Sequence, residues 1–89
     1  MKPIYKIHYS SLFRRMFKKL PKSLTYEVSV REQIFRKDCF DPRLDTHKLK
    51  GKYKKSWSFS ITHKNRIMFD FLTDTDVLFI SVGDHDIYR

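Results

Sequence analysis

Cysteine and glycine are scarce in this 89-residue chain, and each shortage excludes a class of protein. A single cysteine, Cys39, rules out an internal disulfide framework, and no CxxC pair or His/Cys cluster has the spacing of a structural zinc site. Two glycines cannot build a phosphate-binding loop or a dinucleotide-binding fingerprint. The HExxH spacing of zinc hydrolases and the nucleophile elbow are absent too. We therefore interpret Cys39 as a free thiol near a helix end and expect no metal and no cofactor.

Long apolar runs are also missing. No run approaches the roughly 20 residues of a membrane-spanning helix, and the opening MKPIYKIHYS lacks the apolar core of a signal peptide. We therefore expect a cytoplasmic protein without a membrane partner. The chain is nevertheless 40% hydrophobic and 16% aromatic, which is enough for one small core. Together with the length, this composition predicts a single domain over residues 1–89.

Acidic residues are few: the chain has 10 aspartates and glutamates and 19 lysines and arginines, which gives a formal charge of +9. A surface of this charge attracts RNA, DNA, anionic lipid or an acidic protein. The segment from His47 to Arg66 contains no acidic residue at all. Its basic side chains are Lys48, Lys50, Lys52, Lys54, Lys55, Lys64 and Arg66. This concentration of positive charge indicates that the chain binds a polyanion, and it argues against the plainer interpretation of a basic surface without such a partner.

The first half of the chain has the pattern of a strand followed by two helices. Residues 2–9 are rich in Ile and Tyr and predict a strand. Ser10 or Ser11 is expected to cap a helix with one apolar stripe, which packs on a core or, less commonly, lies on a membrane surface. Pro21 should end that helix, and Ser23 should cap a second helix that runs to about residue 37. A link this short favours an antiparallel pair of helices.

The second half predicts an irregular segment over residues 38–55 and then an antiparallel meander. Apolar and polar residues alternate over 57–62 and 66–72, with a turn at 63–65, whereas 77–82 is apolar on both faces, as in a central strand. The expected fold class is α+β, with two N-terminal helices packed on one face of a small, mainly antiparallel sheet. The alternation places Ser58, Ser60, Arg66 and Asp70 on the opposite face, which is therefore expected to be basic and open.

The polar residues of this face and its surroundings suit metal-free RNA cleavage. In that reaction a base takes the proton of the 2′-hydroxyl, an acid protonates the departing 5′-oxygen, and cations stabilise the phosphate. Histidine suits both proton transfers, and arginine donates two parallel hydrogen bonds to phosphate. His47, Arg66 and His85 supply this set, the lysines of the basic segment are suited to hold the strand, and Tyr88 is suited to stack on a base.

Each of these polar residues also has a plainer interpretation, because a polar side chain in a loop is usually only solvated. His8 in the first strand and His63 in the hairpin turn are interpreted as structural. Asp84 either lies in a solvated turn or orients the neighbouring His85.

Four segments carry a resemblance to a known family: HKLKG at 47–51, WSFSI at 57–61, NRIMF at 65–69 and VGDHDIY at 82–88. Their order and spacing resemble the RelE/ParE superfamily of type II toxin–antitoxin systems, and most of all its RelE/YafQ-type mRNA interferases. The helix that ends at Leu20-Pro21 after a run of lysines fits the same family. The resemblance extends over nearly the whole chain.

The resemblance implies a toxin that acts as a metal-independent endoribonuclease on messenger RNA being translated by the ribosome. It also implies a cognate antitoxin that neutralises the toxin and through which the pair binds operator DNA. Position by position, His47 matches a proton-transfer residue, Arg66 the arginine at the scissile phosphate, His85 a general acid and Tyr88 an aromatic residue that places the base. The resemblance also allows Asp84 a supporting role beside His85. Whether His47 or His85 is the base stays open.

Two alternatives remain at this stage. ParE-like members share the fold but inhibit DNA gyrase and cut no RNA. The other alternative is a basic RNA-binding domain or a toxin remnant without activity. The presence of both His47 and His85 favours the nuclease, because a gyrase-binding surface has no need of two titrating groups.

Overall fold

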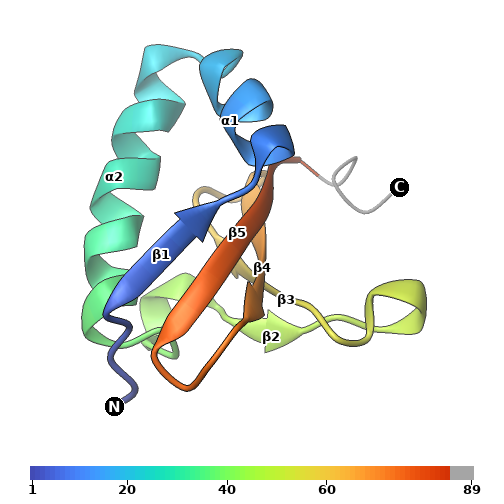
Figure 1. The fold of residues 1–89 in the computed structure, drawn as a ribbon. Coiled ribbons are helices and arrows are strands. Elements are labelled where there is room, and N and C mark those ends of the chain that lie inside the picture. Colours follow the sequence, from blue (N-terminus) through green and yellow to red (C-terminus); the bar gives the residue numbers. More distant parts are fainter. Residues whose placement is uncertain (85–89) are drawn as a thin grey trace.

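The computed structural model describes residues 1–84, which form a five-stranded sheet with two helices on one face (Figure 1). The order across the sheet is β1-β5-β4-β3-β2, with β1 parallel to β5 and all other neighbours antiparallel. This confirms the predicted α+β class. The strands are β1 (Lys6–Tyr9), β2 (His47–Lys48), β3 (Trp57–Ser60), β4 (Arg66–Phe71) and β5 (Asp76–Gly83), and the helices are α1 (Ser11–Lys18) and α2 (Lys22–Lys37). Short 3₁₀ helices span Pro42–Leu44 and Gly51–Tyr53.

The start of α1 follows the prediction, whereas the start of α2 does not. The Ser10 Oγ accepts a hydrogen bond from the Phe13 amide at 2.9 Å and donates to the Ile80 carbonyl at 2.6 Å, so it caps α1 and ties it to β5. The predicted Ser23 cap is wrong. Pro21 precedes the first helical residue with its φ fixed at −61°, and no side chain caps α2.

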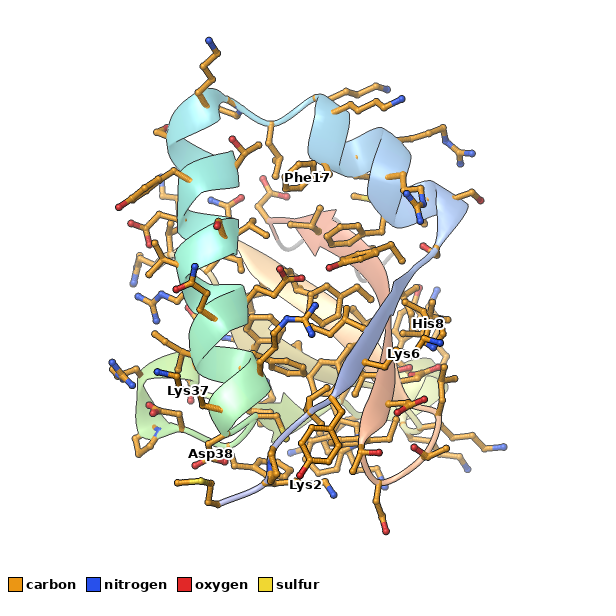
Figure 2. The ribbon with its side chains drawn as sticks, turned by 60° about the vertical axis from the view of Figure 1, so that its left-hand side comes forward. Lys2, Lys6, His8, Phe17, Lys37 and Asp38 are labelled. Atoms are coloured by element: carbon orange, nitrogen blue, oxygen red, sulfur yellow. The ribbon has the colours of Figure 1, made fainter. Side chains whose placement is uncertain are left out.

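Two strands also differ from the prediction. β1 begins only at Lys6, and two earlier residues bond to α2 and the segment after it: Ile4 donates to the Arg36 carbonyl at 2.9 Å, and the Lys2 carbonyl accepts from the Cys39 amide at 3.0 Å. Figure 2 shows Lys2 beside the C-terminal end of α2. β2 lies within the predicted irregular segment, and with two residues it is too short for alternation to reveal.

The core lies between the helices and the sheet. Phe35 on α2 is fully buried, and its ring centroid lies 4.7 Å from that of Phe59, 5.0 Å from that of Phe69 and 5.4 Å from that of Phe79. These partners come from β3, β4 and β5, so one side chain joins α2 to three strands. β5 occupies the predicted interior position, between β1 and β4.

The face of the sheet turned away from the helices is the one expected to carry function. Ser58 lies opposite both His47 and Met68, and Ser60 lies opposite Arg66, so these residues share that face. Its centre is less open than predicted, because Ser58 is inaccessible and Met68 is 5% exposed. In the described part of the chain, no helix is long and apolar enough to cross a membrane.

Candidate active site

His47 and Arg66, which the sequence separates by the whole of β3, meet on the outer face of the sheet. β3 pairs with β2 on one side and with β4 on the other, so both residues lie beside Ser58 and Ser60. One terminal nitrogen of Arg66, Nη2, lies 3.2 Å from the Nδ1 atom of His47. The predicted proton-transfer residue and the predicted phosphate-binding residue are therefore in direct contact.

The guanidinium of Arg66 is held by three further contacts. Its Nε donates to the Ser58 Oγ at 2.9 Å, its Nη2 to the Asp45 carbonyl at 2.8 Å, and its Nη1 lies 3.4 Å from the Asp45 carboxylate. The Arg66 side chain is only 19% exposed. The planar group thus has a fixed orientation, with its terminal nitrogens toward β2, and such a fork matches two oxygens of a phosphate.

The backbone conformation of Asp45 directs its carbonyl toward both His47 and Arg66. Its φ of 49° and ψ of 48° are left-handed, a conformation that aspartate tolerates better than most residues, and it ends the 3₁₀ helix Pro42–Leu44. The same carbonyl lies 3.2 Å from the His47 Nδ1. The Asp45 carboxylate is 76% exposed, so its ion pair with Arg66 adds little stability.

Asp45 and Ser58 are parts of this site that the sequence alone did not identify. Alternation did place Ser58 on the outer face, and that was the available signal for its contact with Arg66. For Asp45 the only signal was its position two residues before His47 and shortly after Pro42. That pattern predicts a turn, but it does not predict the direction of the Asp45 carbonyl.

The imidazole of His47 is the accessible part of the site. Its Nδ1 is engaged by Arg66 and Asp45, and the residue is exposed on the edge strand β2. Nε2 is therefore the nitrogen that can reach a substrate. Within residues 1–84, contacts are found only for Nδ1. An imidazole held by the protein through one nitrogen is suited to take up or deliver a proton through the other.

The end of β5 reaches the same region. Gly83 lies opposite Arg66 in the β4–β5 pair, and Asp84, which follows it, is exposed. His85 and Tyr88, the remaining predicted site residues, lie outside the described residues. Their roles therefore stay predictions.

The predicted substrate-binding lysines divide into two groups. Lys48 lies opposite Trp57, and its Nζ is 5.9 Å from the centroid of that indole, so alternation turns it to the sheet face opposite His47. The others are exposed in the loop between β2 and β3, which Figure 1 shows projecting beyond the sheet. They are Lys50, Lys52, Lys54 and Lys55.

The histidines interpreted as structural lie on β1 and in the turn between β3 and β4. His8 is on β1, four strands across the sheet from β2, a separation of about 19 Å at the usual spacing between strands. Figure 2 shows His8 and Lys6 on the side of β1 away from α2. His63 is exposed in the turn between β3 and β4. His8 is therefore remote from His47, whereas His63 lies three residues before Arg66 in the sequence.

Within the described residues, neither Cys39 nor a group of metal-binding side chains forms a second reactive site. Burial raises the pKa of the Cys39 thiol to about 11, which keeps it protonated and a poor nucleophile near neutral pH. Among residues 1–84, no three histidine, cysteine, aspartate or glutamate side chains lie close enough together to hold a metal ion.

Comparison with known proteins identifies the fold. No protein-family model and no curated protein matches the chain. Among solved structures, the YoeB/ParE toxin from Agrobacterium tumefaciens has a TM-score of 0.76 at 14% identity, over 91% of this chain and 99% of the toxin. YafQ from E. coli has a TM-score of 0.69 at 16% identity, over 93% of this chain and 96% of YafQ. A chain of the RelB–RelE antitoxin–toxin complex from Methanococcus jannaschii has a TM-score of 0.71 at 19% identity, over 91% and 94%.

This chain has the RelE/ParE toxin fold. The expectation drawn from the four sequence segments is thereby confirmed for the architecture of the chain. In the RelE/ParE fold of this protein, the helices cover one face of the sheet, and the pair formed by His47 and Arg66 lies on the other.

Proposed function

We propose that this protein is the toxin of a type II toxin–antitoxin system and that it cleaves messenger RNA during translation, without a metal. The single observation that carries the nuclease assignment is the contact between His47 and Arg66 on the uncovered face of the sheet. The fold, shared with YoeB/ParE, YafQ and RelE toxins, supports the toxin assignment. Action on the ribosome places the protein in the cytoplasm.

The proposed chemistry follows from these two side chains. Arg66 binds the non-bridging oxygens of the scissile phosphate and stabilises the charge that builds up as the 2′-oxygen attacks phosphorus. His47, through Nε2, transfers one of the two protons, and His85 is proposed to transfer the other. The bond to the 5′-oxygen breaks, which leaves a 2′,3′-cyclic phosphate and a 5′-hydroxyl. The exposed lysines at 50, 52, 54 and 55, which add positive charge beside β2, and Tyr88 are proposed to hold the RNA.

Primer extension on a messenger RNA during in vitro translation tests this proposal. The wild-type protein should create discrete new 5′ ends that require active ribosomes. Arg66→Ala and His85→Ala should reduce cleavage by about 100-fold or more. His63→Ala is the matched control, because it removes an exposed histidine of the neighbouring turn and should leave cleavage unchanged. Full cleavage by Arg66→Ala would refute the assigned site.

Inhibition of DNA gyrase is the second candidate. The structural likeness to a YoeB/ParE toxin is compatible with it, because the fold alone does not separate nucleases from gyrase inhibitors. A supercoiling assay with purified gyrase distinguishes the two. We expect unimpaired supercoiling at protein concentrations that cleave RNA. Inhibited supercoiling together with intact RNA would replace the nuclease by the gyrase inhibitor.

We further propose an acidic antitoxin as the partner of this basic chain, since the RelB–RelE and DinJ–YafQ neighbours were solved as antitoxin–toxin complexes. A cavity of about 430 Å³ between α1 and α2 offers a docking surface away from His47. Phe13, Phe17 and Val28 supply its apolar lining, and Arg14 and Lys18 supply positive charge; Figure 2 shows Phe17 between the two helices. Operator DNA would then be bound only through the antitoxin.

Co-expression with the product of a neighbouring small acidic reading frame tests this partner. The two proteins should co-purify, and the double variant Arg14→Glu/Lys18→Glu should weaken their association while RNA cleavage by the free toxin is retained. Unchanged association would place the antitoxin on another surface.

A further inference from the structure

The Nδ1 atom of His47 lies between two groups with opposite requirements. The Arg66 Nη2, at 3.2 Å, can only donate a hydrogen bond, so it needs an Nδ1 without a proton. The Asp45 carbonyl, also at 3.2 Å, can only accept, so it needs an Nδ1 that carries a proton. A neutral imidazole has one ring proton and satisfies only one of these neighbours at a time.

Two arrangements of the site result. In the first, Arg66 donates to both the Asp45 carbonyl and the His47 Nδ1, and the imidazole carries its proton on Nε2. In the second, Arg66 has turned away, and Nδ1–H donates to the Asp45 carbonyl in its place. The Asp45 carbonyl keeps a donor in both arrangements. Only the second presents an unprotonated Nε2 to a substrate.

From this geometry, and resting on the proposed nuclease function, we infer that Arg66 sets the tautomer of His47. In the free protein, Arg66 holds His47 in the Nε2–H form, which cannot act as a base through its accessible nitrogen. When a phosphate of the RNA takes the terminal nitrogens of Arg66, His47 changes to the Nδ1–H form. Asp45 is thus a positioning residue that acts through its main-chain carbonyl.

The phosphate is a competent trigger because it competes for the same nitrogens. Asp45 and His47 occupy Nη1 and Nη2 of Arg66, whereas the buried Ser58 holds only Nε. A bidentate phosphate on Nη1 and Nη2 therefore displaces Asp45 and His47 and leaves the anchor at Ser58 in place. Protons balance in the exchange: Nε2 releases one to water and Nδ1 takes one from water, with no change in net charge.

NMR of the full-length protein labelled with ¹⁵N-histidine and ¹⁵N-arginine tests the inference. In mildly alkaline buffer, where imidazoles are neutral, long-range ¹H–¹⁵N spectra distinguish the two tautomers, and His47→Gln identifies the relevant signals. We expect the Nε2–H form to dominate by about tenfold or more in the free wild type, because the bond from Arg66 is charge-assisted. Arg66→Met, which cannot donate, should reverse the ratio. Asp45→Asn, which keeps the carbonyl, should not.

Binding of a 2′-O-methyl RNA oligonucleotide, which cannot be cleaved, supplies the second arm. A shift of the Arg66 Nε signal should accompany conversion of His47 to the Nδ1–H form. An Arg66 shift without a tautomer change would overturn the inference, as would equal tautomer ratios in wild type and Arg66→Met. If the tautomer reverses in Arg66→Met but RNA leaves the Arg66 signal unmoved, the coupling within the free protein stands and the phosphate is refuted as its trigger. The proposed function is decided separately, by the primer-extension assay.

Discussion

At the scale of single residues, substitution of Ser58 tests whether this serine fixes the orientation of the Arg66 guanidinium. Ser58→Ala removes the buried acceptor of the Arg66 Nε. We expect a loss of about 1 kcal/mol, a fall in Tm of about 4–8 °C, and weaker RNA cleavage because the guanidinium is no longer fixed. Ser60→Ala is the control, since the Ser60 Oγ donates to the Thr62 carbonyl instead. If the two variants cleave RNA equally well in primer extension, Ser58 does not position Arg66.

A buried thiol, Cys39, and a partly buried phenol, Tyr9, predict how stability depends on alkaline pH. Burial raises the pKa of Cys39 from 9.0 to about 11. Burial and the bond to Glu32 raise the pKa of Tyr9 from 10.0 to about 12. The unfolded chain therefore loses these protons at lower pH than the folded protein, so stability should be complete below about pH 9 and should fall between pH 9 and 12. Urea unfolding across this range measures the effect, and Tyr9→Phe should reduce it. Stability that rises with pH in this window would contradict the assignment.

The site could be predicted only in part at this scale. Alternation along β3 and β4 put Ser58 and Arg66 on one face, and chemistry singled out His47. The contacts of Asp45 could not be predicted, because they depend on a left-handed backbone at one residue and on the pairing of a two-residue strand. Nothing in the sequence pattern of residues 38–55 specifies either feature.

At the scale of elements, the two helix starts offer a matched pair of serines. Ser10→Ala should destabilise the protein by about 1–2 kcal/mol, because the Ser10 Oγ both caps α1 and bonds to the Ile80 carbonyl. Ser23→Ala should change stability by less than about 0.5 kcal/mol, because Ser23 is exposed and caps nothing. Urea unfolding of both variants measures the difference. Equal losses would mean that the caps have been assigned wrongly.

Most elements could be predicted because their apolar patterns are long enough to have a period. β3, β4 and β5 begin within one residue of the predicted strands, and α2 ends at Lys37 as expected. The exceptions have specific causes. Ile4 donates to the Arg36 carbonyl near the end of α2, Lys2 accepts from the Cys39 amide just after the helix, and Pro21 rather than Ser23 precedes α2. Each is a contact between distant segments or a backbone preference that periodicity does not record.

At the scale of the whole molecule, the excess of positive charge should appear as salt-dependent RNA binding. The loop between β2 and β3 carries exposed lysines that no core contact requires. Replacing Lys50, Lys52, Lys54 and Lys55 together by Gln should leave stability nearly unchanged. The slope of log affinity for a 2′-O-methyl RNA against log salt should become shallower by about 0.7 for each phosphate that these lysines neutralise in the wild type. An unchanged slope would place the RNA on another surface.

The central claim concerns the reaction itself: a metal-free attack by the 2′-hydroxyl at the face formed by His47 and Arg66. The most direct test replaces the nucleotide 5′ of a mapped cut by its 2′-deoxy form in a translated message and identifies the chemical ends of the products. We predict no cleavage of the deoxy message, and 2′,3′-cyclic phosphate and 5′-hydroxyl ends from the unmodified one. Cleavage of the deoxy message, or products with 5′-phosphate ends, would contradict the account.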